Sequence, residues 1–158
     1  ARPIYEARYM LCATPELAAT LPEHPQDLDP LLCLGVLPEE RRTSNPWELT
    51  RGEEVVLLHP RGRLHFNSND ALVEAARHGA GVIHVLDIFT HRAVQEGDLV
   101  PVYTDWQTSS RTFYAVTTRA RNDSAKVRAF TDFLNEVIDS ERKPSSFKAV
   151  QVRPLGKR

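Results

Sequence analysis

The stretch from residue 63 to residue 86 constrains the fold of this chain more than any other. A polar cluster at 67–70 supplies side chains that cap helix N-termini, and apolar residues then recur at helical spacing up to Gly79. Short apolar runs at 63–66 and 81–86 flank this helix and are typical of strands, the second one buried. Strand, helix and strand in this order predict a βαβ unit with a parallel sheet. The pair Gly79 and Gly81 is expected to end the helix and to let the next strand pack closely.

The rest of the chain alternates similar short elements. Apolar runs predict strands at 8–13, 31–36, 47–49, 54–58, 99–102 and 111–117. Capping and stop residues predict a short helix after Thr14, a helix at 87–96 that ends at Gly97, and a last helix capped by Asn122 or Asp123. The last helix carries one apolar stripe: Val127, Phe130, Phe133, Leu134, Val137 and Ile138.

Length and composition fit one ordinary globular domain or two small lobes. The chain has 158 residues, of which 41% are hydrophobic and 26% charged. It contains no run of the roughly 20 apolar residues that cross a bilayer, and no secretory signal is visible. The two cysteines, Cys12 and Cys33, are too few for a disulfide framework, so we expect two buried thiols in a cytoplasmic protein, with a redox switch as the alternative.

Charge is distributed unevenly along the chain. Residues 1–60 contain five arginines against ten acidic residues, whereas residues 61–158 carry a net positive charge. Residues 141–158 form a basic tail, with six Lys or Arg against one acid. We expect this tail to be a flexible, solvated terminus, and contact with nucleic acid is the alternative.

Signatures of catalysis are absent from the sequence. It holds neither a phosphate-binding G-x-x-x-x-G-K-[ST] loop nor a G-x-S-x-G elbow. His59, His65 and His84 are the candidate bases, but none has a partner at a fixed spacing, so we expect no enzyme, no metal site and no cofactor.

A binding function agrees better with the pattern. Helix N-termini after strands, at Thr14 and at 67–69, are places where backbone N–H groups hold a carboxylate, although plain capping explains them equally well. Trp47 and Trp106 flank loops, where a tryptophan either lines a cleft or packs in the core.

An ordered set of short motifs carries a resemblance over about residues 8–137. The motifs are Ala13-Thr-Pro-Glu-Leu17, His24-Pro-Gln-Asp-Leu28, Leu32-Cys-Leu34, Trp47-Glu-Leu49, Gly62-Arg-Leu64, Asn67-Ser-Asn-Asp-Ala-Leu72, Ala75-Ala76, Gly79-Ala-Gly81, Gly97-Asp-Leu-Val100, Lys126-Val-Arg-Ala-Phe130 and Asp132-Phe-Leu134. Together they resemble the C-terminal effector-binding domain of LysR-type transcriptional regulators.

This resemblance implies an α/β fold like that of the type 2 periplasmic binding proteins, in which two lobes are joined by two crossing strands. Residues 8–105 would form one complete lobe, and residues 106–140 would return to the other lobe and supply its C-terminal part. The family's winged helix-turn-helix, its linker helix and the opening part of its first lobe have no counterpart in residues 1–158. The apolar stripe of the last helix would then need cover from a neighbouring chain or from a rearranged contact.

The resemblance also implies a function, which is to sense a small effector, such as an organic or aromatic acid, between the lobes of a dimeric regulator. DNA would be bound only through the helix-turn-helix, and no membrane would be involved. By position in the family pattern, the effector site would comprise Gly35, Val36, Leu37, Asn67, Ser68, Asn69, Asp70, Val82, Phe113 and Tyr114. The alternatives are a dimerisation module of the same fold without ligand and a solute-binding protein outside the cytoplasm.

Overall fold

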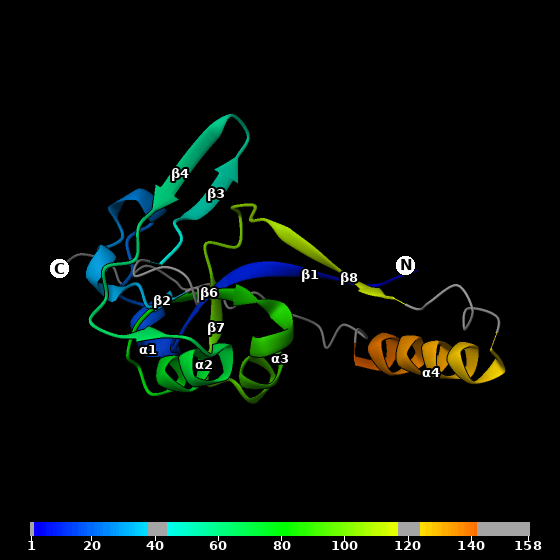
Figure 1. Cartoon of the computed structure of the whole chain (residues 1–158). Coiled ribbons are helices and arrows are strands. Elements are labelled where there is room, and N and C mark those ends of the chain that lie inside the picture. Colours follow the sequence, from blue (N-terminus) through cyan, green and yellow to red (C-terminus); the bar gives the residue numbers. More distant parts are fainter. Residues whose placement is uncertain (1, 38–43, 117–123, 142–158) are drawn as a thin grey trace. The chain divides into compact units, whose positions relative to one another are not determined.

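The computed structural model describes residues 2–37, 44–116 and 124–141 (Figure 1). The chain divides into two compact units, of which unit 2 comprises residues 7–111 and unit 1 comprises residues 1–6 and 112–158. The expected helix caps Asn122 and Asp123, the strand end at Thr117 and the basic tail from residue 142 onward lie outside the described residues.

Unit 2 is built on a mixed sheet. Strand β1 (Arg2–Ala13) pairs antiparallel with β6 (Ile83–Leu86) on one side and with β7 (Val100–Val102) on the other. Strand β2 (Gly35–Val36) pairs in parallel with β5 (His65–Phe66). A parallel bridge between Cys33 and Val82, just before β2 and β6, joins the two sets of strands. The spatial order is therefore β5-β2-β6-β1-β7.

The predicted strand-helix-strand unit is confirmed. Helix α2 (Asn69–Arg77) connects β5 to β6, and both strands run parallel to the segment that lies between them. Ser68 is the N-cap residue of α2, and its Oγ accepts the N–H of Ala71 at 3.5 Å. Gly79 has φ of 76°, and a Cβ at Gly81 would collide with the carbonyl oxygen of Leu32, which accepts the N–H of Val82. These two glycines therefore end the helix and permit close strand packing, as expected.

Other elements also agree with the sequence, with three corrections, of which the first is that β1 begins at Arg2 and not at Arg8 as predicted. Helix α1 (Pro15–Ala18) follows its N-cap Thr14, and α3 (Asp87–Glu96) ends at Gly97 with φ of 81°. The strand predicted at 31–36 is wrong at its start, because Asp29 accepts the N–H of Leu31 at 2.9 Å and the chain turns as a 3₁₀ helix, η2 (Pro30–Leu32). The strand predicted at 63–66 contains only the two residues of β5.

A hairpin covers one face of the sheet. Strands β3 (Trp47–Arg51) and β4 (Glu54–Leu58) pair antiparallel around a turn at Gly52, which has φ of 62° (Figure 1). The hairpin and the 3₁₀ helix η1 (Pro25–Asp27) lie in contact. Together with the sheet they enclose a hairpin-side core: Leu11, Ala13, Leu28, Cys33, Trp47, Leu49, Val56, Leu58, Val82 and Trp106.

Helices α2 and α3 cover the opposite face and enclose a helix-side core (Figure 1). Its buried members are Cys12, Leu34, Leu72, Val73, Ala76, Ile83, Val85, Ala93 and Leu99. Neighbouring residues such as Leu11 and Cys12, or Val82 and Ile83, belong to different cores because successive strand side chains point to opposite faces. Coverage of both faces explains why the strands read as continuous apolar runs.

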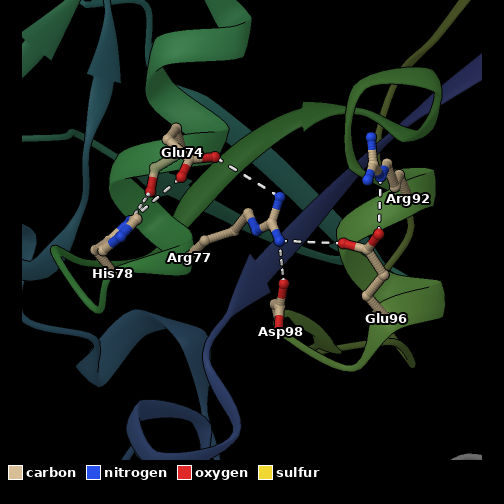
Figure 2. Close-up of polar contacts among 6 residues, drawn as sticks. All are labelled: Glu74, Arg77, His78, Arg92, Glu96 and Asp98. Carbon is tan, nitrogen blue, oxygen red and sulfur yellow. Dashed lines mark hydrogen bonds and ion pairs between the residues drawn. The ribbon is translucent and has the colours of Figure 1, made fainter.

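A charged cluster links α2 to α3 at the surface (Figure 2). The guanidinium of Arg77 on α2 contacts Glu96 at 3.1 Å and also Asp98, which follows α3. Hydrogen bonding to Asp98 raises the pKa of Arg77 above its ordinary value. Arg92 contacts Glu96 from within α3 at 2.7 Å, so one carboxylate joins both helices.

The described part of unit 1 contains the end of strand β8 (Ser110–Ala115) and helix α4 (Ala125–Glu141). Strand β8 pairs with β1, and the rings of Tyr5 and Phe113 lie 6.4 Å apart. On α4, Phe130 and Phe133 are exposed while Val127, Leu134 and Ile138 are half-buried. The partner expected to cover this stripe stays a prediction.

Candidate functional site

A pocket of about 550 Å³ lies entirely within unit 2. It forms where the start of the β3–β4 hairpin faces strands β1 and β6, the N-terminus of α2 and the segment that leads into β8. The volume falls within the range of roughly 300–1,000 Å³ typical of small-molecule sites. The lining residues are Tyr9, Val36, Asn45, Pro46, Trp47, Glu48, Thr50, Asn69, His84, Gln107, Thr108, Ser109 and Arg111.

Backbone hydrogen bonds hold the walls of this pocket together. The hairpin is joined to the segment before β8 by two bonds between Thr50 and Gln107, with N···O distances of 2.9 and 2.7 Å. The same segment is joined to β1, because the N–H of Tyr9 donates to Ser109 O at 2.9 Å and the Thr108 hydroxyl donates to Tyr9 O. Three segments far apart in the sequence are thereby fixed around one space.

Aromatic rings form one wall. The imidazole of His84 on β6 stacks against the Tyr9 ring at a centroid distance of 4.8 Å, and it lies 5.4 Å from the Trp47 ring. Burial lowers the pKa of His84 from 6.5 to about 4, so the ring is neutral at pH 7. Its Nε2 atom is buried and has no hydrogen-bond partner among the described residues.

Polar groups surround the rest of the pocket. Asn69 is the first residue of α2, where backbone N–H groups have no partner within the helix. Glu48 and Arg111 are exposed at the pocket and supply one negative and one positive charge. Amide and hydroxyl side chains complete the lining. The arrangement suits recognition of a small polar molecule with a planar part.

Two of the ten site residues predicted from the family pattern line this pocket, namely Val36 and Asn69. Gly35 is buried beside them, and the N–H of Leu37 donates to the backbone oxygen of Phe66 at 2.8 Å. Asn67, the N-cap Ser68 and Asp70 are exposed around the N-terminus of α2.

The other predicted site residues lie elsewhere. Val82 is fully buried in the hairpin-side core. Phe113 and Tyr114 belong to unit 1 and are 39% and 55% exposed. They are not among the residues that line the pocket of unit 2, so a role for them in effector binding stays a prediction.

The two tryptophans take different positions. Trp47 is buried in the hairpin-side core and also lines the pocket, so both of the expected interpretations apply to it. Trp106 is buried in the hairpin-side core, with the Arg51 guanidinium 4.4 Å above its ring and the His24 ring 5.1 Å away edge-on. The second candidate helix start, Thr14, caps α1 through the N–H of Leu17 at 3.3 Å and does not line the pocket.

Sequence reasoning missed most of the lining. Tyr9, Glu48, Gln107 and Arg111 carry no local signal, because only the strand pairing brings their segments together. His84 was identifiable only as a histidine inside a predicted buried strand, a position in which an unpaired imidazole is unusual.

Other candidate chemistry is limited in the described residues. Cys12 and Cys33 are free and buried, which confirms the expectation of two buried thiols, and burial raises the pKa of each thiol to about 12. The described part of the chain holds no group of three or more His, Cys, Asp or Glu that is placed to bind a metal ion. Within the same residues, no helix combines the length and apolarity of a membrane span.

Comparison with known proteins identifies relatives of this fold. Residues 1–139 match the family model described as the LysR substrate binding domain. An HTH-type transcriptional repressor of Pseudomonas aeruginosa is 26% identical over 87% of this chain and 44% of its own length. The HTH-type transcriptional regulator PtxR of the same species is 32% identical over 82% and 41%. The chain thus spans less than half the length of these two relatives.

A solved structure extends the comparison. The regulatory domain of AphB from Vibrio vulnificus superposes with a TM-score of 0.70 and 27% identity, over 84% of this chain and 66% of that one. The α/β fold expected from the sequence motifs is therefore confirmed.

Proposed function

The chain belongs to the LysR substrate-binding domain family, and from this premise we propose that it is the effector-sensing part of a LysR-type transcriptional regulator. In this proposal the pocket of unit 2 takes up a small metabolite that carries a carboxylate. The metabolite shifts the population between two arrangements of the regulator, and DNA is bound by a helix-turn-helix that belongs to the whole protein.

The observation that carries the proposal is the pocket itself. It joins an aromatic wall, two oppositely charged side chains and the start of a nine-residue helix. A carboxylate finds two complementary groups there, the guanidinium of Arg111 and the first N–H groups of α2 next to Asn69.

The remaining parts of the proposal follow from the family. We propose that units 1 and 2 correspond to the two lobes, that the protein works as a cytoplasmic homodimer, and that it catalyses no reaction. Relatives named as transcriptional regulators support a role in regulation.

The two tryptophans of the chain provide a matched test of ligand uptake. Variant W106F leaves Trp47 as the emitter at the pocket, whereas W47F leaves Trp106 in the hairpin-side core. Titration with a panel of small carboxylates, including benzoate, salicylate and citrate, should change the emission of W106F in a saturable way for at least one compound. The same compound should leave W47F unchanged.

A gel-shift experiment then tests regulation. It combines the protein as it is produced in cells with a DNA fragment from upstream of its own gene. The active compound should alter DNA affinity or the footprint. If no carboxylate changes the Trp47 emission and the protein is nevertheless a dimer by sedimentation, the ligand-free dimerisation module replaces this proposal.

A further inference from the structure

The charges of the pocket identify its ligand more narrowly than a carboxylate. We propose that the pocket binds a zwitterion, an α-amino acid with an aromatic side chain, a proposal that rests on the function proposed above. The argument uses two oppositely charged residues, Glu48 and Arg111, and the aromatic wall.

Glu48 and Arg111 both line the pocket, and neither forms an ion pair with any other residue that the structure describes. Other charged residues of the same hairpin are paired. Arg51 contacts Asp105 at 2.7 Å and Glu54 at 3.3 Å, and Glu54 also contacts His24. Charge pairing is therefore common in the described part of the hairpin. Among the residues that line the pocket, Glu48 and Arg111 are the acidic and basic side chains, and both lack an ion pair with another described residue.

A ligand of one sign meets an unfavourable charge in this pocket. A simple carboxylate is attracted by Arg111 and repelled by Glu48, and a simple amine experiences the reverse. A zwitterion satisfies both groups, because its carboxylate accepts from the guanidinium and its ammonium donates to the Glu48 carboxylate. Repulsion of the wrong charge is a common source of specificity in binding sites.

The aromatic wall of the pocket favours a ligand with an aromatic side chain. Tyr9, His84 and Trp47 form a continuous aromatic surface, and the imidazole is neutral at pH 7, so no charge opposes an apolar ring. Aromatic pairs prefer offset-stacked or edge-to-face contacts, which such a wall offers to a planar group.

Three matched probes separate the contributions of the ammonium group and the carboxylate of an aromatic amino acid to its affinity. Phenylalanine carries both, 3-phenylpropionate lacks the ammonium group, and phenethylamine lacks the carboxylate. Calorimetric titration of the protein should show phenylalanine binding about tenfold or more tightly than either of the other two, since each of these lacks one of the two charge-assisted hydrogen bonds.

Substitution of either charge should weaken phenylalanine, but each substitution should strengthen a different single-charge probe. Glu48→Gln should weaken phenylalanine about tenfold and strengthen 3-phenylpropionate, whereas Arg111→Gln should weaken phenylalanine and strengthen phenethylamine. Glu53→Gln and Arg63→Gln change exposed charges that do not line the pocket and should leave all three affinities unchanged. This crossed pattern does not arise from a general loss of folding.

The inference is overturned if 3-phenylpropionate binds as tightly as phenylalanine, or if Glu48→Gln leaves their ratio unchanged. It is also overturned if none of the three probes binds while other carboxylates still change the Trp47 emission, and in that case the proposed function survives. Absence of any response of Trp47 to every compound removes the proposed function as well.

Discussion

The neutral imidazole of His84 links the stability of unit 2 to pH. Burial lowers the pKa of this ring from 6.5 to about 4 in the folded protein, whereas in the unfolded chain the ring titrates near its ordinary value. Between these two pH values the unfolded state binds more protons than the folded state. The contribution of His84 to stability is therefore fully present above about pH 6.5 and is lost as the pH falls to about 4.

The size of the effect follows from the two pKa values. Linkage gives a loss of about 2 kcal/mol at pH 5, relative to pH 7.5, and of about 3 kcal/mol once the pH is below both values. These are upper figures, because His84 is only half-buried as a residue and the accessible part of its ring weakens the effect.

Replacement of His84 by Phe isolates this contribution. The phenyl ring keeps the stacking with Tyr9 and Trp47 but removes the titrating group and the buried Nε2 without a described partner. H84F should be more stable than the original protein by roughly 1 kcal/mol at pH 7.5, because a buried unsatisfied polar atom is destabilising. The difference should widen by up to about 2 kcal/mol at pH 5.

Urea unfolding followed by tryptophan fluorescence at pH 7.5, 6 and 5 measures these differences, since both tryptophans lie in the hairpin-side core of unit 2. His59→Phe serves as the control, because His59 is exposed, and its stability should follow that of the original protein at each pH. If the original protein and H84F lose stability in parallel between pH 7.5 and pH 5, the reasoning about His84 is refuted.

Three further predictions test the packing. Gly81→Ala should destabilise unit 2 by about 1–3 kcal/mol in urea unfolding, because a Cβ there meets backbone, and an unchanged midpoint would contradict the close approach. Cys12 and Cys33 should not react with Ellman's reagent at pH 8 until urea is added, whereas rapid labelling of the native protein would show exposed thiolates. Arg77→Ala should lower the melting temperature more than Arg92→Ala, since only Arg77 joins α2 to α3 and Asp98, and the difference should shrink in about 1 M NaCl; equal effects would argue against the link.

Much of unit 2 is predictable from the sequence because its signals are local. Ser68 accepts an N–H three residues away, and Gly97 adopts its positive φ directly after α3, so both helix boundaries depend only on adjacent residues. The 3₁₀ helix η2, which replaces the start of a predicted strand, also has a local cause, because the Asp29 side chain accepts a backbone N–H only two residues away. At Pro30–Leu32 this hydrogen bond favours a 3₁₀ turn over the strand that the apolar run predicts.

The pocket differs, because no local interaction encodes it. Tyr9, Thr50, His84 and Gln107 approach one another through pairing of β1 with β6 and through the bridge between the hairpin and the segment before β8. Val36 and Asn69, two residues that the family pattern predicts for the effector site, line this space. The pattern carries no information on which side chains of other segments face them.

The sequence by itself determined the order of strands and helices, the family of the domain and the burial of both cysteines, since apolar periodicity and capping act over a few residues. Only the tertiary structure decided that a neutral histidine lies between two aromatic rings and that Glu48 and Arg111 share one pocket. The physical reason is that strand register and long-range packing set which distant side chains meet, and these depend on the whole fold.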